Sequence, residues 1–111
     1  MMYSVAISRS AELDIHQAFH WWHENRSPDQ AFRWYHQIVE AVETLEHMPE
    51  RCPLAAEAQS IGVPVRQLLF GVGKGPATHR ILFTIVNNGV RVLRVLHVSM
   101  APLTKPSDLA Q

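Results

Sequence analysis

The sequence predicts an α+β fold in which a helical hairpin packs on one face of a mostly antiparallel sheet. Two features predict it. Apolar residues recur at helical spacing over residues 11–48. In later segments apolar and polar residues alternate, and turns rich in glycine and asparagine separate these segments. The expected order of elements is β-α-α-β-β-β. We expect one domain over residues 1–100 and a loosely ordered tail over residues 101–111.

The composition is that of a globular protein. The chain has 111 residues, of which 47% are hydrophobic and 18% are charged. These proportions support one modest core and argue against disorder. No apolar run is long enough to span a bilayer, and the first residues lack the apolar centre of a signal peptide. Cys52 is the single cysteine, so we expect no internal disulfide and a reducing cytoplasm.

The charges are distributed unevenly, although the formal net charge is zero. Residues 1–57 hold nine acidic residues and four arginines, whereas residues 58–107 hold six basic residues and no acidic one. One interpretation is a basic docking face in the second half of the chain. The other is a helical half whose glutamates are simply solvated.

Local signals place the first elements. Residues 3–8 alternate with a period of two, which predicts a short strand, and Ser10 is expected to cap the helix that follows. Ser27 begins a second helix, because it is followed by proline and, three residues after the cap, by Gln30. Pro49 is expected to end that helix, since it has no N–H and clashes with the preceding turn. The short link requires the two helices to pack antiparallel.

A β-hairpin is predicted between Thr78 and Met100. Asn88-Gly89 between two apolar strands is the strongest short-range signal for a two-residue turn. If Asn87 pairs with Val90, one side of the hairpin is the more apolar and faces the helices. Arg94 also falls on that side, and we expect it to reach the sheet edge or an acidic residue of the helices. The residues predicted on this side are His79, Ile81, Phe83, Ile85, Val92, Arg94, Leu96 and Val98.

The same register places Arg80 opposite His97 on the open side of the sheet, with Arg91 at the turn end. The preceding strand, residues 63–70, adds Arg66 if that residue also faces the open side. Two guanidiniums and an imidazole in one place bind phosphates, or stabilise and protonate groups during phosphodiester cleavage. The alternative is a surface that docks an acidic partner peptide, which is the commoner role of a basic cluster.

Two further motifs carry less weight. His16, His20 and His23 share a helix face, but no Asp, Glu or Cys completes a metal-binding set, so we expect no metal. The segment Gly71–Gly75, which contains Lys74, lacks the spacing of a phosphate-binding loop and predicts a mobile connection. No cofactor is expected from either motif.

Short motifs follow one another along nearly the whole chain. They are Ala11…Asp14-Ile15…Trp21, Ser27-Pro28…Ala31, Leu45…Pro49, Val65-Arg66…Gly71, His79-Arg80-Ile81-Leu82-Phe83 and Leu96-His97-Val98-Ser99-Met100. In this order and spacing, they resemble the RelE/ParE superfamily of bacterial type II toxins. The resemblance implies a helical hairpin on an antiparallel sheet. It also implies a toxin held inactive by an antitoxin encoded beside it, whose flexible, often acidic segment wraps the toxin.

The resemblance implies alternative activities. ParE-like members, the plasmid stabilisation system proteins, poison DNA gyrase by binding it and do no chemistry. RelE-like members cut mRNA on the ribosome without a metal, and in that case Arg66, Arg80 and His97 would be the catalytic residues. Here Ser99-Met100 replaces the basic residue that RelE-like members carry after the last strand, and no tyrosine follows. We therefore favour a ParE-like toxin, with the ribonuclease and a non-toxic interaction module of the same fold as alternatives.

A ParE-like toxin would bind its partners through exposed residues of the sheet and its loops. The expected partners are a cognate antitoxin and either gyrase or the ribosome with its mRNA, and no membrane. One exposed tryptophan would mark an antitoxin or homodimer contact. The candidate partner-binding residues are Arg66, Arg80, Arg91, His97 and Lys74.

Overall fold

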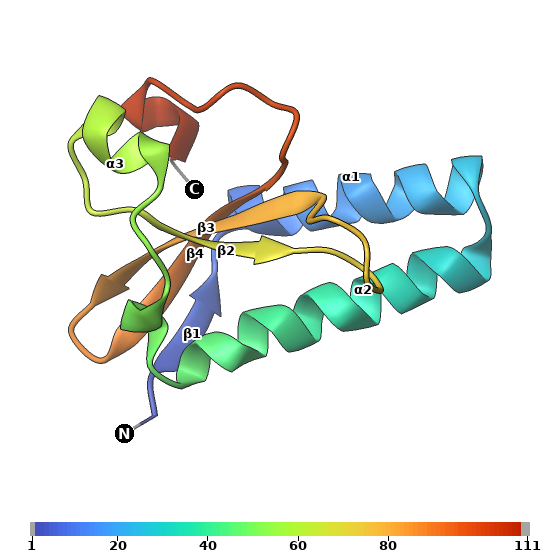
Figure 1. Cartoon of the computed structure of the whole chain (residues 1–111), viewed down its shortest axis with the longest axis horizontal. Helices are drawn as coiled ribbons and strands as arrows, with labels where there is room; N and C mark the ends of the chain where they lie inside the picture. The colour runs from blue at the N-terminus through green and yellow to red at the C-terminus, as the bar shows by residue number, and fades with distance from the viewer. Residues whose placement is uncertain (1, 110–111) are drawn as a thin grey trace.

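The computed structural model describes residues 2–109 and has the predicted α+β fold (Figure 1). Four strands form one sheet in the order β1-β4-β3-β2, in which β1 runs parallel to β4 and the other neighbours are antiparallel. No helix in this part of the chain is long and apolar enough to cross a membrane. The elements are β1 (Ser4–Ile7), α1 (Arg9–Asn25), α2 (Pro28–Glu43), the 3-10 helices η1 (Thr44–Glu46) and η2 (Pro49–Arg51), α3 (Ala56–Ile61), β2 (Arg66–Phe70), β3 (His79–Val86), β4 (Gly89–His97) and η3 (Pro106–Leu109).

The N-cap residue predicted for α2 is confirmed, whereas the one predicted for α1 is wrong. The Ser27 hydroxyl accepts the Gln30 backbone N–H at 3.1 Å, as predicted. In α1 the cap is Ser8 rather than Ser10, because β1 ends at Ile7 and the chain turns directly into the helix. Helix α2 ends at Glu43, where the backbone tightens into η1, so the prediction that it continues to Pro49 is wrong.

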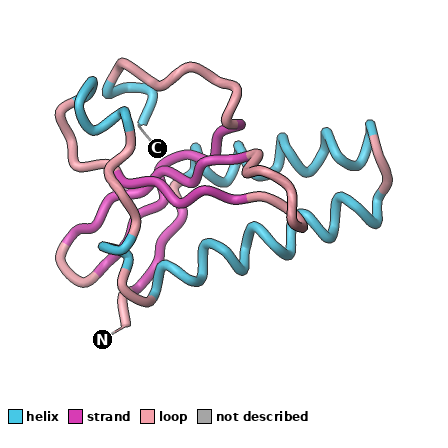
Figure 2. The backbone as a smooth tube through the Cα atoms, in the orientation of Figure 1, coloured by secondary structure: helices cyan, strands magenta, loops and turns pink. Residues whose placement is uncertain are grey.

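Helices α1 and α2 form an antiparallel hairpin over one face of the sheet (Figures 1 and 2). Its free end, where α1 passes into α2, projects beyond the strands. Each helix contributes small and large apolar residues at helical spacing to the main core. This core includes Ala11, Ile15, Trp34, Ile38, Val42, Leu45, Phe70, Ile81, Phe83, Val90, Val92 and Val95.

A second, smaller core lies on the opposite face of the sheet, beneath α3 and the C-terminal segment (Figure 1). Leu109 of η3 is only 8% exposed and packs into it. Within the tail that was expected to be loosely ordered, Pro106–Leu109 forms η3 against this core, and residues 110–111 lie outside the described residues. This face of the sheet is covered at one end rather than open. The residues of this core are Ala55, Val65, Leu82, Leu93, Leu96 and Leu109.

The turn of the β3–β4 hairpin lies one residue earlier than predicted. Val86 pairs with Gly89, so Asn87 and Asn88 form the turn in place of Asn88-Gly89. Asn87 takes a positive φ of 57°. Asparagine adopts this conformation more readily than most residues, because its short polar side chain hydrogen-bonds locally.

A β-bulge also interrupts the hairpin. Leu82 pairs with Arg94 but Phe83 pairs with Val92, which leaves one extra residue in β4. Residues beyond the bulge consequently exchange sides. Leu96 joins the core beneath α3 instead of the core beneath the helices, so the predicted side of this half of β4 is wrong.

Candidate partner-binding groove

The structure does not bring Arg66, Arg80 and His97 together, and the predicted convergence is wrong. His97 pairs with His79 on the side of the helices. Arg80 pairs with Leu96 and lies on the opposite side, beneath α3. The bulge causes this separation. It shifts the pairing by one residue in the half of β4 that follows it, so that His97 lies on the side of His79 and not on the side of Arg80.

Arg80 is held in a buried ion pair. Its guanidinium donates to Glu57 Oε2 at 2.7 Å, to Glu57 Oε1 at 3.0 Å and to Gln67 Oε1 at 3.1 Å. Arg80 is 9% exposed and Glu57 is 0% exposed. The hydrogen bond from Arg80 lowers the pKa of Glu57, which also accepts the Leu103 backbone N–H at 3.0 Å. Arg80 therefore anchors α3 and the C-terminal segment to the sheet.

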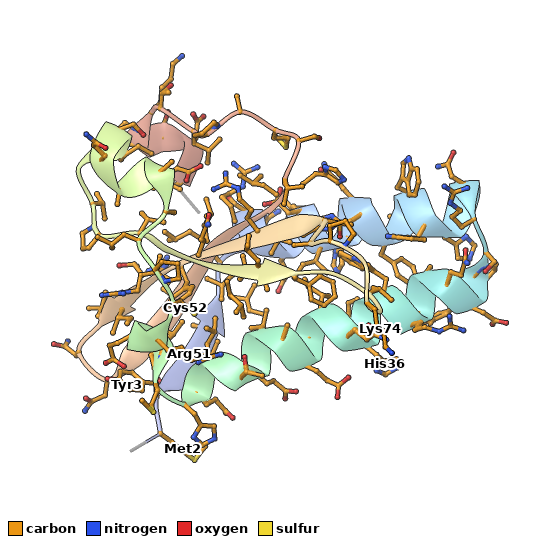
Figure 3. The ribbon with its side chains drawn as sticks, in the orientation of Figure 1. Met2, Tyr3, His36, Arg51, Cys52 and Lys74 are labelled. Atoms are coloured by element: carbon orange, nitrogen blue, oxygen red, sulfur yellow. The ribbon has the colours of Figure 1, made fainter. Side chains whose placement is uncertain are left out.

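The other predicted basic residues are dispersed. Arg66 donates to the backbone carbonyls of Cys52 at 2.6 Å and Glu50 at 3.3 Å, which fixes the connection after η2. Lys74 is exposed on the β2–β3 loop and lies well apart from Cys52 (Figure 3). Arg91 is exposed on β4 near the hairpin turn. These residues therefore form no continuous basic face.

Arg94 finds an acidic residue of the helices, as the sequence predicted. Its Nε and Nη2 donate to the two carboxylate oxygens of Asp14 in α1, at 2.7 and 3.0 Å, and its Nη1 donates to the Asp108 carbonyl at 2.8 Å. Asp14 also accepts the backbone N–H of Val95 at 2.9 Å. Since β1 pairs with β4 only as far as Val92, Asp14 supplies an acceptor that a longer neighbouring strand would otherwise provide.

Beside this ion pair, a groove of about 480 Å³ runs between α1 and the adjoining ends of β3 and β4. Trp21 and Met100 form exposed parts of its wall, with 50% and 47% of their surfaces accessible. Asp14 and Arg94 satisfy each other, so the rest of the wall is mainly apolar and aromatic. Such a wall fits apolar side chains of a partner. The groove is lined by Asp14, Gln17, Ala18, Trp21, Trp22, Thr78, His79, Arg94, Val95, Leu96, His97 and Met100.

Two histidines lie side by side in the lining of this groove. The rings of His79 and His97 are 5.3 Å apart, and His79 also packs on Trp34 of α2 with ring centroids 5.4 Å apart. Burial, with a smaller contribution from His97, lowers the pKa of His79 from 6.5 to about 4. His79 is therefore neutral at pH 7. His97 Nδ1 accepts the Ser99 backbone N–H at 3.1 Å.

A second hollow of about 460 Å³ lies beside β1 and the hairpin turn. Small residues such as Ser4, Ala6 and Gly89 line much of it, and Arg91 is on its wall. It offers fewer large side chains for anchoring a partner than the groove does. Among residues 2–109, no group of three or more His, Cys, Asp or Glu side chains could hold a metal ion. His16, His20 and His23 do not form such a group either.

The sequence predicted His97 as a site residue, but beside Arg80, and it predicted one exposed tryptophan without indicating which; Asp14 and Glu57 were not predicted as site residues. A signal existed for both. Arg94 required an acidic partner, and Asp14 adjoins Ile15 at the edge of the apolar stripe of α1. Glu57 is the last acidic residue before the basic half of the chain. The ion pairs Asp14–Arg94 and Glu57–Arg80 thus join the acidic half to the basic half.

Comparisons with known proteins agree with this architecture. The family model described as "ParE toxin of type II toxin-antitoxin system, parDE" matches residues 5–102. Among solved structures, the chain is similar to one described as "Chromosomal ParDE TA system from P. aeruginosa". The TM-score is 0.73 and the sequence identity 20%, over 88% of this chain and 98% of that chain. No curated protein matches the sequence. The structural likeness shows a shared fold.

Proposed function

The chain belongs to the ParE toxin family of type II toxin–antitoxin systems, and on this premise we propose that it acts by binding DNA gyrase and is neutralised by a cognate antitoxin. The observation that carries the proposal is the family match over residues 5–102. The proposed location is the cytoplasm, where both partners would be met.

The geometry favours binding over RNA cleavage. A ribonuclease needs cationic and proton-transferring groups within reach of one phosphate. Here the Arg80 guanidinium forms an ion pair with Glu57, and the Arg66 guanidinium donates to two backbone carbonyls. His97 lies on the other side of the sheet from Arg80. These three residues therefore do not form the site that the ribonuclease alternative requires.

Two assays with the purified toxin test the proposed target. We expect inhibition of DNA supercoiling by purified gyrase, relieved when the antitoxin is added in equal amount. We expect intact message when the toxin is incubated with translating ribosomes and mRNA. Cleaved mRNA together with unchanged supercoiling would refute the gyrase proposal in favour of the ribonuclease.

The groove beside α1 is the proposed binding site of the antitoxin. Trp21 and Met100 expose apolar surface there, and the charges of Asp14 and Arg94 are already paired. An antitoxin side chain entering the groove would meet mainly apolar and aromatic groups. We therefore expect a large apolar residue of the antitoxin as the anchor, rather than a carboxylate.

Replacing Trp21 with alanine should weaken antitoxin binding strongly. An aromatic anchor at the centre of an interface is typically worth about 2 kcal/mol, which corresponds to a dissociation constant raised about 30-fold. Isothermal titration calorimetry on the variant and the wild type measures the change. Leu69→Ala, at a residue that is 54% exposed on β2 and does not line the groove, is the matched control and should leave the affinity unchanged. Equal affinities for wild type and Trp21→Ala would exclude the groove as the antitoxin site.

A further inference from the structure

A cluster of aromatic rings bridges the two helices near the free end of their hairpin. Phe19 of α1 contacts Phe32 of α2 edge-to-face with ring centroids 5.2 Å apart, and Tyr35 with centroids 6.0 Å apart. Phe32 is 54% exposed and Tyr35 is 37% exposed. Residues this apolar and this exposed, gathered in one place, are typical of a protein interaction surface.

This cluster is not part of the core. Phe32 and Tyr35 each follow a buried residue, Ala31 and Trp34, by one position, which is about 100° around the helix. They therefore lie to the side of the stripe that meets the sheet. The free end of the hairpin also projects beyond the strands, where no other element of residues 2–109 covers it (Figure 1).

Carboxylates continue the same surface toward the base of the hairpin. Glu12 precedes Phe19 by seven residues and Glu43 follows Tyr35 by eight, so each lies about two turns away on the same side of its helix. Both are exposed, and neither forms an ion pair with the described residues. Asp14 and Glu57, by contrast, are neutralised within the chain. We refer to Phe19, Phe32, Tyr35, Glu12 and Glu43 as the seam surface.

We propose that the seam surface binds a basic surface of the toxin's target protein. Arginine and lysine side chains stack on exposed aromatic faces and pair with carboxylates, so exposed rings with unpaired glutamates about two helical turns away on the same surface complement an extended cationic surface. A second copy of this chain fits less well, because the residues of the seam surface include two carboxylates and no arginine or lysine to pair with them. The proposal rests on the function proposed above, in which the target is gyrase.

The seam surface is separate from the groove. Trp21 on the groove and Phe19 on the seam surface are two residues apart, which is about 200° around α1, so they lie on opposite sides of this helix. Substitutions in one surface can therefore leave the other surface intact.

Substitutions in the seam surface should weaken binding to gyrase and leave binding to the antitoxin unchanged. We expect Phe32→Ala, and separately Glu12→Lys combined with Glu43→Lys, to weaken gyrase binding at least about tenfold in surface plasmon resonance. Antitoxin affinity should stay within about twofold. Leu69→Ala, with the same 54% exposure as Phe32 but on β2, should change neither affinity. Circular dichroism confirms that each variant is folded.

The possible failures are distinguishable. If the wild type binds gyrase and both seam variants bind it equally well, the inference is overturned and the proposed function stands. If the wild type does not bind gyrase, the proposed function fails. NMR titration of the toxin with a short peptide of alternating arginine and leucine then decides the inference. Amide shifts around Phe32 that disappear in Phe32→Ala support it, and shifts elsewhere or none refute it.

Discussion

Replacing Glu57 with alanine should destabilise the protein by about 3 to 5 kcal/mol, which is a large part of the stability of a domain of this size. Arg80 is only 9% exposed, and the substitution deprives its guanidinium of the two carboxylate oxygens that accept from it at 2.7 and 3.0 Å. It also removes the acceptor of the Leu103 N–H. Urea denaturation at pH 7 measures the loss as a lower midpoint.

The double variant Glu57→Leu with Arg80→Met is the control for this prediction. It replaces both charges by apolar side chains of similar length, so no buried charge remains unpaired, and we expect most of the lost stability to return. If Glu57→Ala alone unfolds at the wild-type urea concentration, the ion pair does not stabilise the fold. Amide exchange of residues 103–109 should rise in Glu57→Ala, because Glu57 holds Leu103.

Acidification from pH 6.5 to pH 4 should remove about 3 kcal/mol of stability through His79 alone. Its pKa is lowered from 6.5 to about 4, mainly by burial and further by His97. The unfolded chain therefore binds a proton at a higher pH than the folded chain does. The stability that neutral His79 contributes is fully present above the unfolded pKa and is lost as the pH falls toward the folded pKa.

His79→Phe tests this prediction, because it keeps a ring against Trp34 and removes the titrating group. Carboxylates titrate in both proteins, so the difference between their pH profiles isolates His79. We expect the free energy of unfolding of the variant to decline less than that of the wild type between pH 6.5 and pH 4. Parallel profiles over this range would show that His79 titrates alike in the folded and unfolded chains.

Much of the fold was predictable because its signals are local. The cap at Ser27, the helical spacing of apolar residues in α1 and α2, and the asparagine-rich turn each act over a few residues. An acidic residue of the helices was one of the two outcomes that the sequence predicted for Arg94, and the structure shows that outcome. The sequence did not predict which acidic residue it would be.

The candidate site was harder to predict, because it depends on register. The bulge between β3 and β4 has no sequence signal, yet it decides whether His97 lies beside Arg80 or beside His79. The alternation of side chains along a strand has a period of two, so a shift of one residue exchanges the two faces of the sheet. The prediction of a basic cluster failed at this step, although each predicted strand was found within a few residues of its expected position.

The sequence by itself determined the fold class, the helical hairpin and the resemblance to the RelE/ParE superfamily, because short-range patterns and their order carry that information. Only the tertiary structure decided how the charges pair. Asp14 and Arg94 are 80 residues apart in the chain, and Glu57 and Arg80 are 23 residues apart. Two acidic residues of the first half therefore join it to arginines of the second half, and the groove and the seam surface remain as the places where partners are expected to bind.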